Sequence, residues 1–121
     1  MKMKELAKAL GFALLGATAY AQATKPVATP EPGVTREVLF DEKAFRATAT
    51  IREAGSVEAP GTHPMDVLIV ATSEGTADVA VLGKNQGAWK VGKTYFIPRN
   101  ADHRFANTGK TPIHYVAVSI H

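Results

Sequence analysis

The 121-residue sequence contains no cysteine, which excludes a disulfide framework, a thiolate metal site and a cysteine nucleophile. It also lacks a long apolar run at its N-terminus. Residues 9–17 are apolar, but as a helix such a run rises only about 14 Å, roughly half the hydrocarbon thickness of a bilayer. The sequence has no glycine-rich P-loop motif for phosphate binding. Its length corresponds to a single domain.

The first 21 residues have the three parts of a secretory signal peptide. Three lysines (Lys2, Lys4 and Lys8) precede the apolar run, and Ala19-Tyr20-Ala21 then places small residues two apart, as a signal peptidase requires. The alternative, a membrane anchor, is disfavoured because the run is too short. We therefore expect a signal peptide at 1–21, with cleavage after Ala21 or, alternatively, after Ala19. The mature protein would be periplasmic or secreted.

The basic character of the chain is concentrated in that segment. The formal net charge is +3, but without residues 1–21 the chain holds 11 basic and 10 acidic residues. This near balance gives no support for a nucleic-acid partner.

A proline-rich linker follows at residues 22–34. Pro26, Pro30, Pro32 and Gly33 exclude a helix or a central strand there. We expect the folded domain to span residues 35–121.

The rest of the sequence is typical of short strands. Residues 45–53 alternate between an apolar face that begins at Phe45 and a polar face that begins at Arg46, which indicates a half-buried strand. Residues 66–72 and 76–82 are separated only by Ser73-Glu74-Gly75, which predicts a hairpin. Further strands are expected at 88–91, 94–97, 103–106 and 113–120. About eight short strands with glycine turns, and no helical periodicity, predict an all-β barrel or sandwich.

Two glycine-bounded stretches, residues 55–75 and 92–107, resemble the paired motifs of the cupin superfamily. The second motif, G-x5-P-x-G-x2-H-x3-N, is matched by Gly92, Pro98, His103 and Asn107. Asn100 replaces its middle glycine, and asparagine tolerates the positive φ that such a position requires.

The first motif, G-x5-H-x-H-x4-E-x6-G, keeps only its frame, at Gly55, His63 and Gly75. The resemblance covers nearly all of residues 35–121 and implies a small cupin-like β-barrel, the double-stranded β-helix or jelly roll. It also implies a homodimer, for which the candidate sheet edges are residues 35–40 and 45–53.

Two of the four metal ligands of the family are missing, because Gly61 and Leu68 stand where the motif has a histidine and the glutamate. The resemblance leaves His63 and His103. Asp66 lies two residues before Leu68, so both would share one face of a strand. If that face is the interior, His63, Asp66 and His103 would form the two-histidine, one-carboxylate set that holds Fe(II) and that also suits Mn, Ni, Cu or Zn.

Two interpretations of function remain open. In the first, the protein is an exported cupin that binds a small molecule in its barrel without catalysis, and the histidines are polar residues of a metal-free pocket. In the second, it is a metal-dependent enzyme, a dioxygenase or an isomerase-like enzyme, that uses His63, Asp66 and His103. His114 is a further candidate for an inward-facing polar group. Trp89, Tyr95, Phe96 and Phe105 are expected to pack in the barrel or line the pocket.

Overall fold

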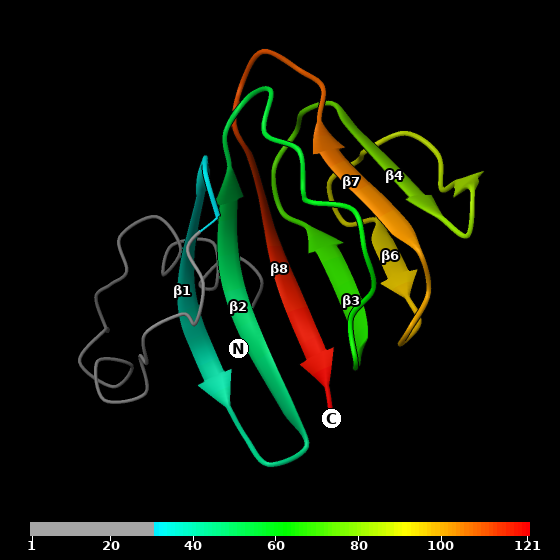
Figure 1. Ribbon diagram of the computed structural model, residues 1–121. Helices are drawn as coiled ribbons and strands as arrows, with labels where there is room; N and C mark the ends of the chain where they lie inside the picture. Colours follow the sequence, from blue (N-terminus) through cyan, green and yellow to red (C-terminus); the bar gives the residue numbers. More distant parts are fainter. Residues whose placement is uncertain (1–30) are drawn as a thin grey trace.

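The structure is a computed structural model that describes residues 31–121. The predicted signal peptide and residues 22–30 of the predicted linker lie outside the described residues. In the described part the chain is all-β, as expected, and forms eight strands (Figure 1): β1 (Val34–Asp41), β2 (Phe45–Arg52), β3 (Asp66–Ala71), β4 (Ala77–Val81), β5 (Lys84–Asn85), β6 (Thr94–Ile97), β7 (His103–Asn107) and β8 (Ile113–Ile120). Within this range no helix is long and apolar enough to cross a membrane.

The strands form two antiparallel sheets. The larger sheet has the order β1-β2-β8-β3-β6, and the smaller one has the order β5-β4-β7. Figure 1 shows β8, the last strand, between β2 and β3 in the larger sheet, with β7 and β4 in a second layer. The two sheets enclose the main apolar core and, beside it, a cavity.

The predicted hairpin of residues 66–72 and 76–82 is wrong. β3 pairs with β6 and β8, whereas β4 pairs with β5 and β7, so the two segments lie in different sheets. The connection between β3 and β4 is held in place through Ser73. Its backbone oxygen accepts a hydrogen bond of 2.9 Å from Trp89 Nε1, and its Oγ accepts one of 2.8 Å from the backbone nitrogen of His114 in β8. These long-range contacts turn the chain from one layer into the other.

One short strand also differs from the expectation. Residues 88–91 are not a strand, while Lys84–Asn85, which lie in a glycine-bounded turn sequence, form β5. Trp89 is instead a core residue. It stacks on Tyr95, with ring centroids 5.3 Å apart, and lies 6.0 Å from the ring of Phe105. Phe96, by contrast, is 48% exposed.

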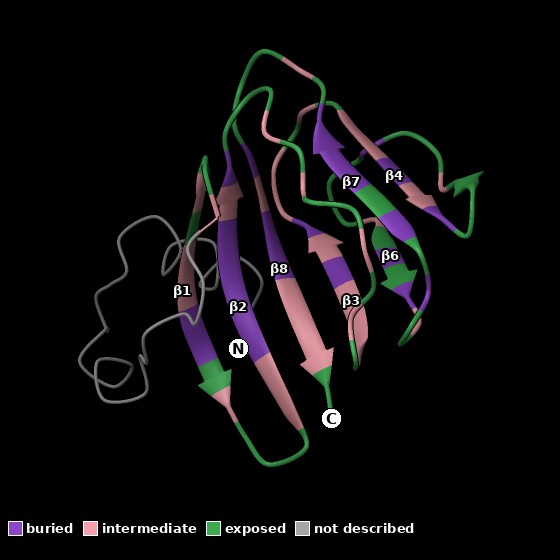
Figure 2. Ribbon diagram, in the orientation of Figure 1, coloured by how far each residue is buried: buried purple, intermediate pink, exposed green. Residues whose placement is uncertain are grey.

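The alternation predicted for residues 45–53 is present in β2, but its polar face is the one that lines the cavity. Thr48, Thr50 and Arg52 face inward. Ala47 and Ala49 pack on the other side of the larger sheet, with Leu39 of β1 and Val116 of β8. Both faces of β2 are therefore largely buried, as the purple colour of this strand in Figure 2 shows.

The alternation of side chains between the two faces of the sheet also decides which residues of β8 face inward. Ile113 and Tyr115 belong to the core between the sheets. His114 pairs with Ile51 of β2 and shares the opposite face with Val116. The expectation that His114 points inward is therefore not met, because the inner face of this strand carries the odd-numbered residues.

Of the two candidate edges for self-association, only one is an edge. β1 is the outer strand of the larger sheet, but β2 is paired on both sides, with β1 and with β8. Residues 45–53 therefore offer no free strand edge. The homodimer itself stays a prediction.

Candidate functional site

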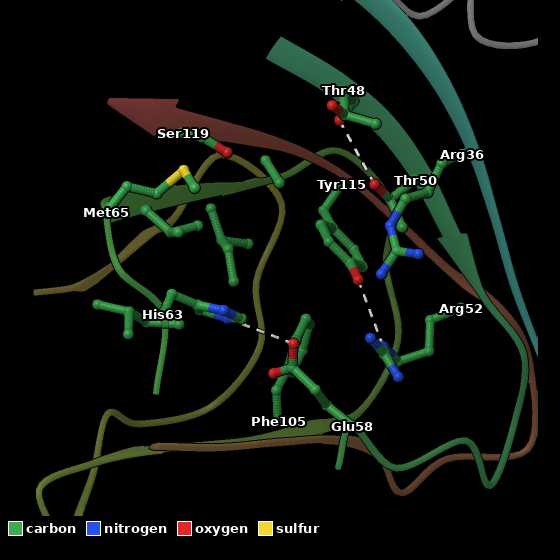
Figure 3. A pocket seen from close by; sticks show the side chains of 14 residues that line it. Arg36, Thr48, Thr50, Arg52, Glu58, His63, Met65, Phe105, Tyr115 and Ser119 are labelled. Atoms are coloured by element: carbon green, nitrogen blue, oxygen red, sulfur yellow. Dashed lines mark hydrogen bonds and ion pairs between the residues drawn. The ribbon is translucent and has the colours of Figure 1, made fainter. Parts of the chain in front are cut away.

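The cavity beside the core has a volume of about 180 Å³. Its lining combines apolar side chains of the larger sheet with a cluster of polar groups, which include Arg36, Arg52, Glu58, His63, Tyr115 and Ser119. Figure 3 shows His63 and Glu58 facing each other, and Tyr115 beside Arg52 on another side of the cavity. An engineered cavity of about 150 Å³ is enough for benzene, so the space suits a small molecule.

The loop between β2 and β3 carries Glu58 and His63, and it is fastened to β7. Isolated bridges join Val57 to Ala106 and Gly61 to His103. The backbone nitrogen of Glu58 also donates to the oxygen of Phe105 at 2.8 Å. The loop therefore runs along the strand that begins with His103, and this brings residues 40 or more positions apart into contact.

The turn before β7 holds the loop at its other end. The backbone nitrogen of Asn100 donates to the oxygen of His63 at 2.7 Å. Asn100 has a φ of 61°, so the replacement of the motif glycine by asparagine is accommodated in the left-handed region as expected.

Glu58, His63 and His103 bring three potential ligand atoms within 4.8 Å of one another. Glu58 Oε1 lies 2.9 Å from Nε2 of His103, and Glu58 Oε2 lies 3.5 Å from Nε2 of His63. The two imidazole rings are 4.5 Å apart between centroids. On its other side, Nδ1 of His103 lies 3.3 Å from the backbone oxygen of Ala101. A proton on Nδ1 would be satisfied there, which leaves Nε2 for a metal ion, as is usual for ligating histidines.

The three side chains are electrostatically matched. Burial opposes the ionisation of Glu58, but the hydrogen bond from His63 and the charges of His103, His63 and Arg52 outweigh it, so the pKa of Glu58 is lowered. The hydrogen bond with Glu58 raises the pKa of His63 against the opposing effect of its partial burial. The carboxylate is therefore anionic at neutral pH, as a ligand for a cation must be.

Asp66 does not join this cluster. It begins β3, where Oδ1 accepts a hydrogen bond of 2.7 Å from the backbone nitrogen of Arg99, and Oδ2 lies 3.5 Å from Nη2 of the same residue. The Arg99 backbone hydrogen bond is the main reason that the pKa of Asp66 is lowered. The expected parity with Leu68 holds, but their shared face is the outer one: Val67 and Ile69 line the cavity instead. The carboxylate beside the two histidines comes from Glu58.

The alternation of strand residues does not predict Glu58 as a site residue, because Glu58 lies in the loop between β2 and β3. The sequence holds one weak signal for this residue. Glu58 is the only charged residue between Gly55 and His63, within the stretch that resembles the first motif. No local pattern, however, places a loop side chain opposite His103.

Solved structures with the same fold are similar to this chain over most of its length. An RmlC-like cupin from Shewanella frigidimarina NCIMB 400 superposes with a TM-score of 0.68 at 18% identity, covering 84% of this chain and 86% of that one. A cupin domain from Bordetella pertussis Tohama I gives 0.61 at 20% identity, with 78% and 99% covered. The polyketide cyclase RemF from Streptomyces resistomycificus gives 0.65 at 21% identity, with 82% and 75% covered.

These likenesses concern the fold alone. No curated protein sequence matches the chain. The sequence profile of the family described as "Cupin domain" (Cupin_2) matches residues 48–119, from β2 to β8, which is more than half of the chain. The protein therefore belongs to the cupin family.

Proposed function

We propose that this cupin binds a small molecule in its cavity, next to one divalent transition-metal ion held by Glu58, His63 and His103. The observation that carries the proposal is the convergence of these three side chains, with all ligand atoms within 4.8 Å. Two imidazole nitrogens and one carboxylate suit Fe(II), and Mn, Ni, Cu and Zn accept the same ligands. The donor set therefore fits a metal without selecting one.

The protein residues have separate tasks in this arrangement. Ala101 orients the ring of His103 through Nδ1, and β7 fixes the loop that carries Glu58. Glu58 and His63 also line the cavity, so a bound molecule would lie against them. When bound, a metal of this class supplies Lewis acidity, and a redox-active one also supplies redox chemistry.

A second candidate function is metal-dependent catalysis of the dioxygenase or isomerase-like class. It is favoured by the position of two of the ligands, Glu58 and His63, on the cavity wall, since three protein ligands leave coordination positions that a substrate can occupy. A substrate in a cavity of about 180 Å³ would have to be small.

The metal site is tested by two matched carboxamide variants. Glu58→Gln removes the carboxylate beside the histidines, whereas Asp66→Asn makes the same change at the carboxylate held by Arg99. Isothermal titration of the chelator-treated protein with Fe(II), Mn(II), Ni(II), Cu(II) and Zn(II) measures the effect. We expect Glu58→Gln and His103→Ala to weaken binding at least about tenfold, since even the loss of a residue that only supports a ligand costs about 10–100-fold.

Asp66→Asn should bind like the wild type. Equal affinities in the wild type, Glu58→Gln and His103→Ala, or no binding by any of them, would refute the metal site and favour a metal-free binding pocket. If Asp66→Asn alone lost affinity, the ligand set with Asp66 would be the better one.

We propose further that the protein acts outside the cytoplasm. The support is the order of lysines, apolar run and Ala19-Tyr20-Ala21 in the sequence. Intact-mass measurement of the exported protein, which would show the loss of the N-terminal segment, tests this proposal.

A further inference from the structure

The carboxylate of Glu31 bridges two arginines beside the cavity. Its Oε1 lies 2.7 Å from Nη2 of Arg36, and its Oε2 lies 2.7 Å from Nη1 of Arg52. Glu31 stands in the segment just before β1, while Arg36 lies on β1 and Arg52 is the last residue of β2. The two guanidinium groups, here called the arginine pair, thus hold one carboxylate by both of its oxygens.

Arg52 needs an anion at this place. Its side chain is only 1% exposed. Its other hydrogen-bond and ring partners are neutral: Nε donates to the hydroxyl of Tyr115 at 3.3 Å, Nη1 donates to Ser56 Oγ at 3.0 Å, and the guanidinium lies 4.9 Å from the ring centroid of Phe105. A buried charge without an opposite charge is strongly unfavourable. The arginine pair therefore keeps a carboxylate bound, but its chemistry does not require that carboxylate to belong to the chain.

The side chain of Glu31 can leave without detaching its segment. The backbone there has its own contacts, because Glu53 N donates to the oxygen of Gly33 at 2.8 Å and Ser56 Oγ donates to the oxygen of Pro32 at 3.3 Å. The side chains of Glu31 and Arg36 are also 19% and 24% exposed, so solvent reaches their ion pair. The backbone of this segment therefore keeps contacts that do not depend on the Glu31 side chain.

Both arginines also line the cavity that Glu58 and His63 line. Figure 3 shows Arg36 and Arg52 on the side where Tyr115 lies, with His63 across the cavity. A small molecule in this space would meet the proposed metal site at one end and two guanidinium groups at the other. Guanidinium groups bind planar carboxylates through paired, charge-assisted hydrogen bonds.

We propose that the arginine pair is a carboxylate-binding subsite of the cavity, that Glu31 occupies it at rest, and that a small carboxylic acid binds by displacing the Glu31 side chain. The inference rests on the proposed function, because it names the class of molecule that the cavity takes. Glu31 then acts as a built-in competitor that sets the affinity for this ligand.

Propionate is the probe, because it has the same atoms as the Glu31 side chain from Cβ to the carboxylate, and propionamide is its neutral counterpart. The full chain is treated with a chelator and studied at constant ionic strength by thermal unfolding and isothermal titration. We expect propionate, but not propionamide, to raise the Tm of Glu31→Ala. It should also bind this variant at least about tenfold more tightly than the wild type, in which Glu31 competes.

Two further variants keep the test decisive. Glu37→Ala removes a glutamate of β1 whose carboxylate forms no ion pair with either arginine, and it should respond to propionate like the wild type. Arg36→Gln in the Glu31→Ala background removes the more exposed half of the pair, and it should weaken the effect of propionate on Tm, because only Arg52 is left to hold the carboxylate. Arg52 itself is left unchanged because its burial makes misfolding the expected result of its loss.

The proposal is overturned if propionate does not stabilise Glu31→Ala, if propionamide does so equally, or if the wild type and Glu31→Ala bind propionate alike. Because metal is removed, the outcome is independent of the metal titration. Propionate binding without metal binding would refute the proposed metal site and leave the subsite standing. Metal binding without propionate binding would refute the subsite alone.

Discussion

The side-chain amide of Asn107 donates a hydrogen bond of 3.0 Å to the backbone oxygen of Arg52, which lies 55 positions earlier in the chain. The same nitrogen donates to the oxygen of Thr111 at 2.8 Å, and Oδ1 of Asn107 accepts from the backbone nitrogen of Gly109. Asn107 thus closes the turn between β7 and β8 and fixes the end of β2, where Arg52 points into the cavity. The asparagine of the second motif is a structural residue of the site.

Asn107→Asp should destabilise the fold. The substitution keeps the shape but replaces the donor nitrogen with an oxygen, so the buried carbonyl of Arg52 and the partly buried carbonyl of Thr111 lose their partner and face a new oxygen. We expect a loss of at least about 2 kcal/mol in the free energy of unfolding, measured by urea denaturation. Asn100→Asp is the matched control in an exposed turn and should change stability by no more than about 0.5 kcal/mol. Equal losses in the two variants would contradict the role given to Asn107.

Gly75 should not tolerate a β-carbon. It has a φ of 152°, and a β-carbon there would overlap Cγ2 of Ile113, a fully buried core residue. Gly61 has the same φ, but a β-carbon there would meet no atom within 4 Å. The backbone strain is common to both positions, so Gly75→Ala should lose about 1–3 kcal/mol more stability than Gly61→Ala. Thermal and urea unfolding of the two variants measure this difference, and similar stabilities would show that Ile113 yields without cost.

The pair of Glu58 and His63 should make the stability of the metal-free protein depend on pH. The raised pKa of His63 stabilises the fold below the ordinary value of 6.5, and this stabilisation is lost as pH rises through the raised pKa. The lowered pKa of Glu58 stabilises the fold above the ordinary value of 4.5, and this is lost as pH falls through the lowered pKa. Both contributions are present together between these two ordinary values.

The difference in the free energy of unfolding between the wild type and Glu58→Gln should therefore be largest between pH 4.5 and 6.5 and shrink on either side. Urea unfolding of chelator-treated protein over a pH series measures it. In the same variant, an NMR titration of the His63 ring should show a lower pKa than in the wild type. A difference that does not vary with pH would indicate that the two side chains do not form the ion pair.

Export should remove the N-terminal segment. The predicted cleavage after Ala21 would make Gln22 the first residue, and cleavage after Ala19 would make it Tyr20. Intact-mass measurement of protein recovered from the periplasm or medium distinguishes the two. Full-length chain in the cytoplasm would contradict the signal peptide.

Several features of the fold follow from local sequence. The alternation in residues 45–53, the glycine turns and the absence of helical periodicity are sufficient for the all-β class, because strand geometry repeats every two residues. The spacing from Gly92 to Asn107 correctly indicated the cupin fold, through its resemblance to a family motif, and the left-handed turn at Asn100, which depends only on residues close together in the chain.

The sequence alone determined that His63 and His103 stand at motif positions and that residues 45–53 have one apolar and one polar face. It did not determine which face lines the cavity, because alternation defines two faces and only the second sheet and the buried Arg52 select the inner one. Only the tertiary structure turned Asp66 towards Arg99 and brought Glu58 to within 2.9 Å of Nε2 of His103, 45 positions away. The physical reason is that a loop side chain takes its place from the strand on which the loop lies, and that contact has no local pattern in the sequence.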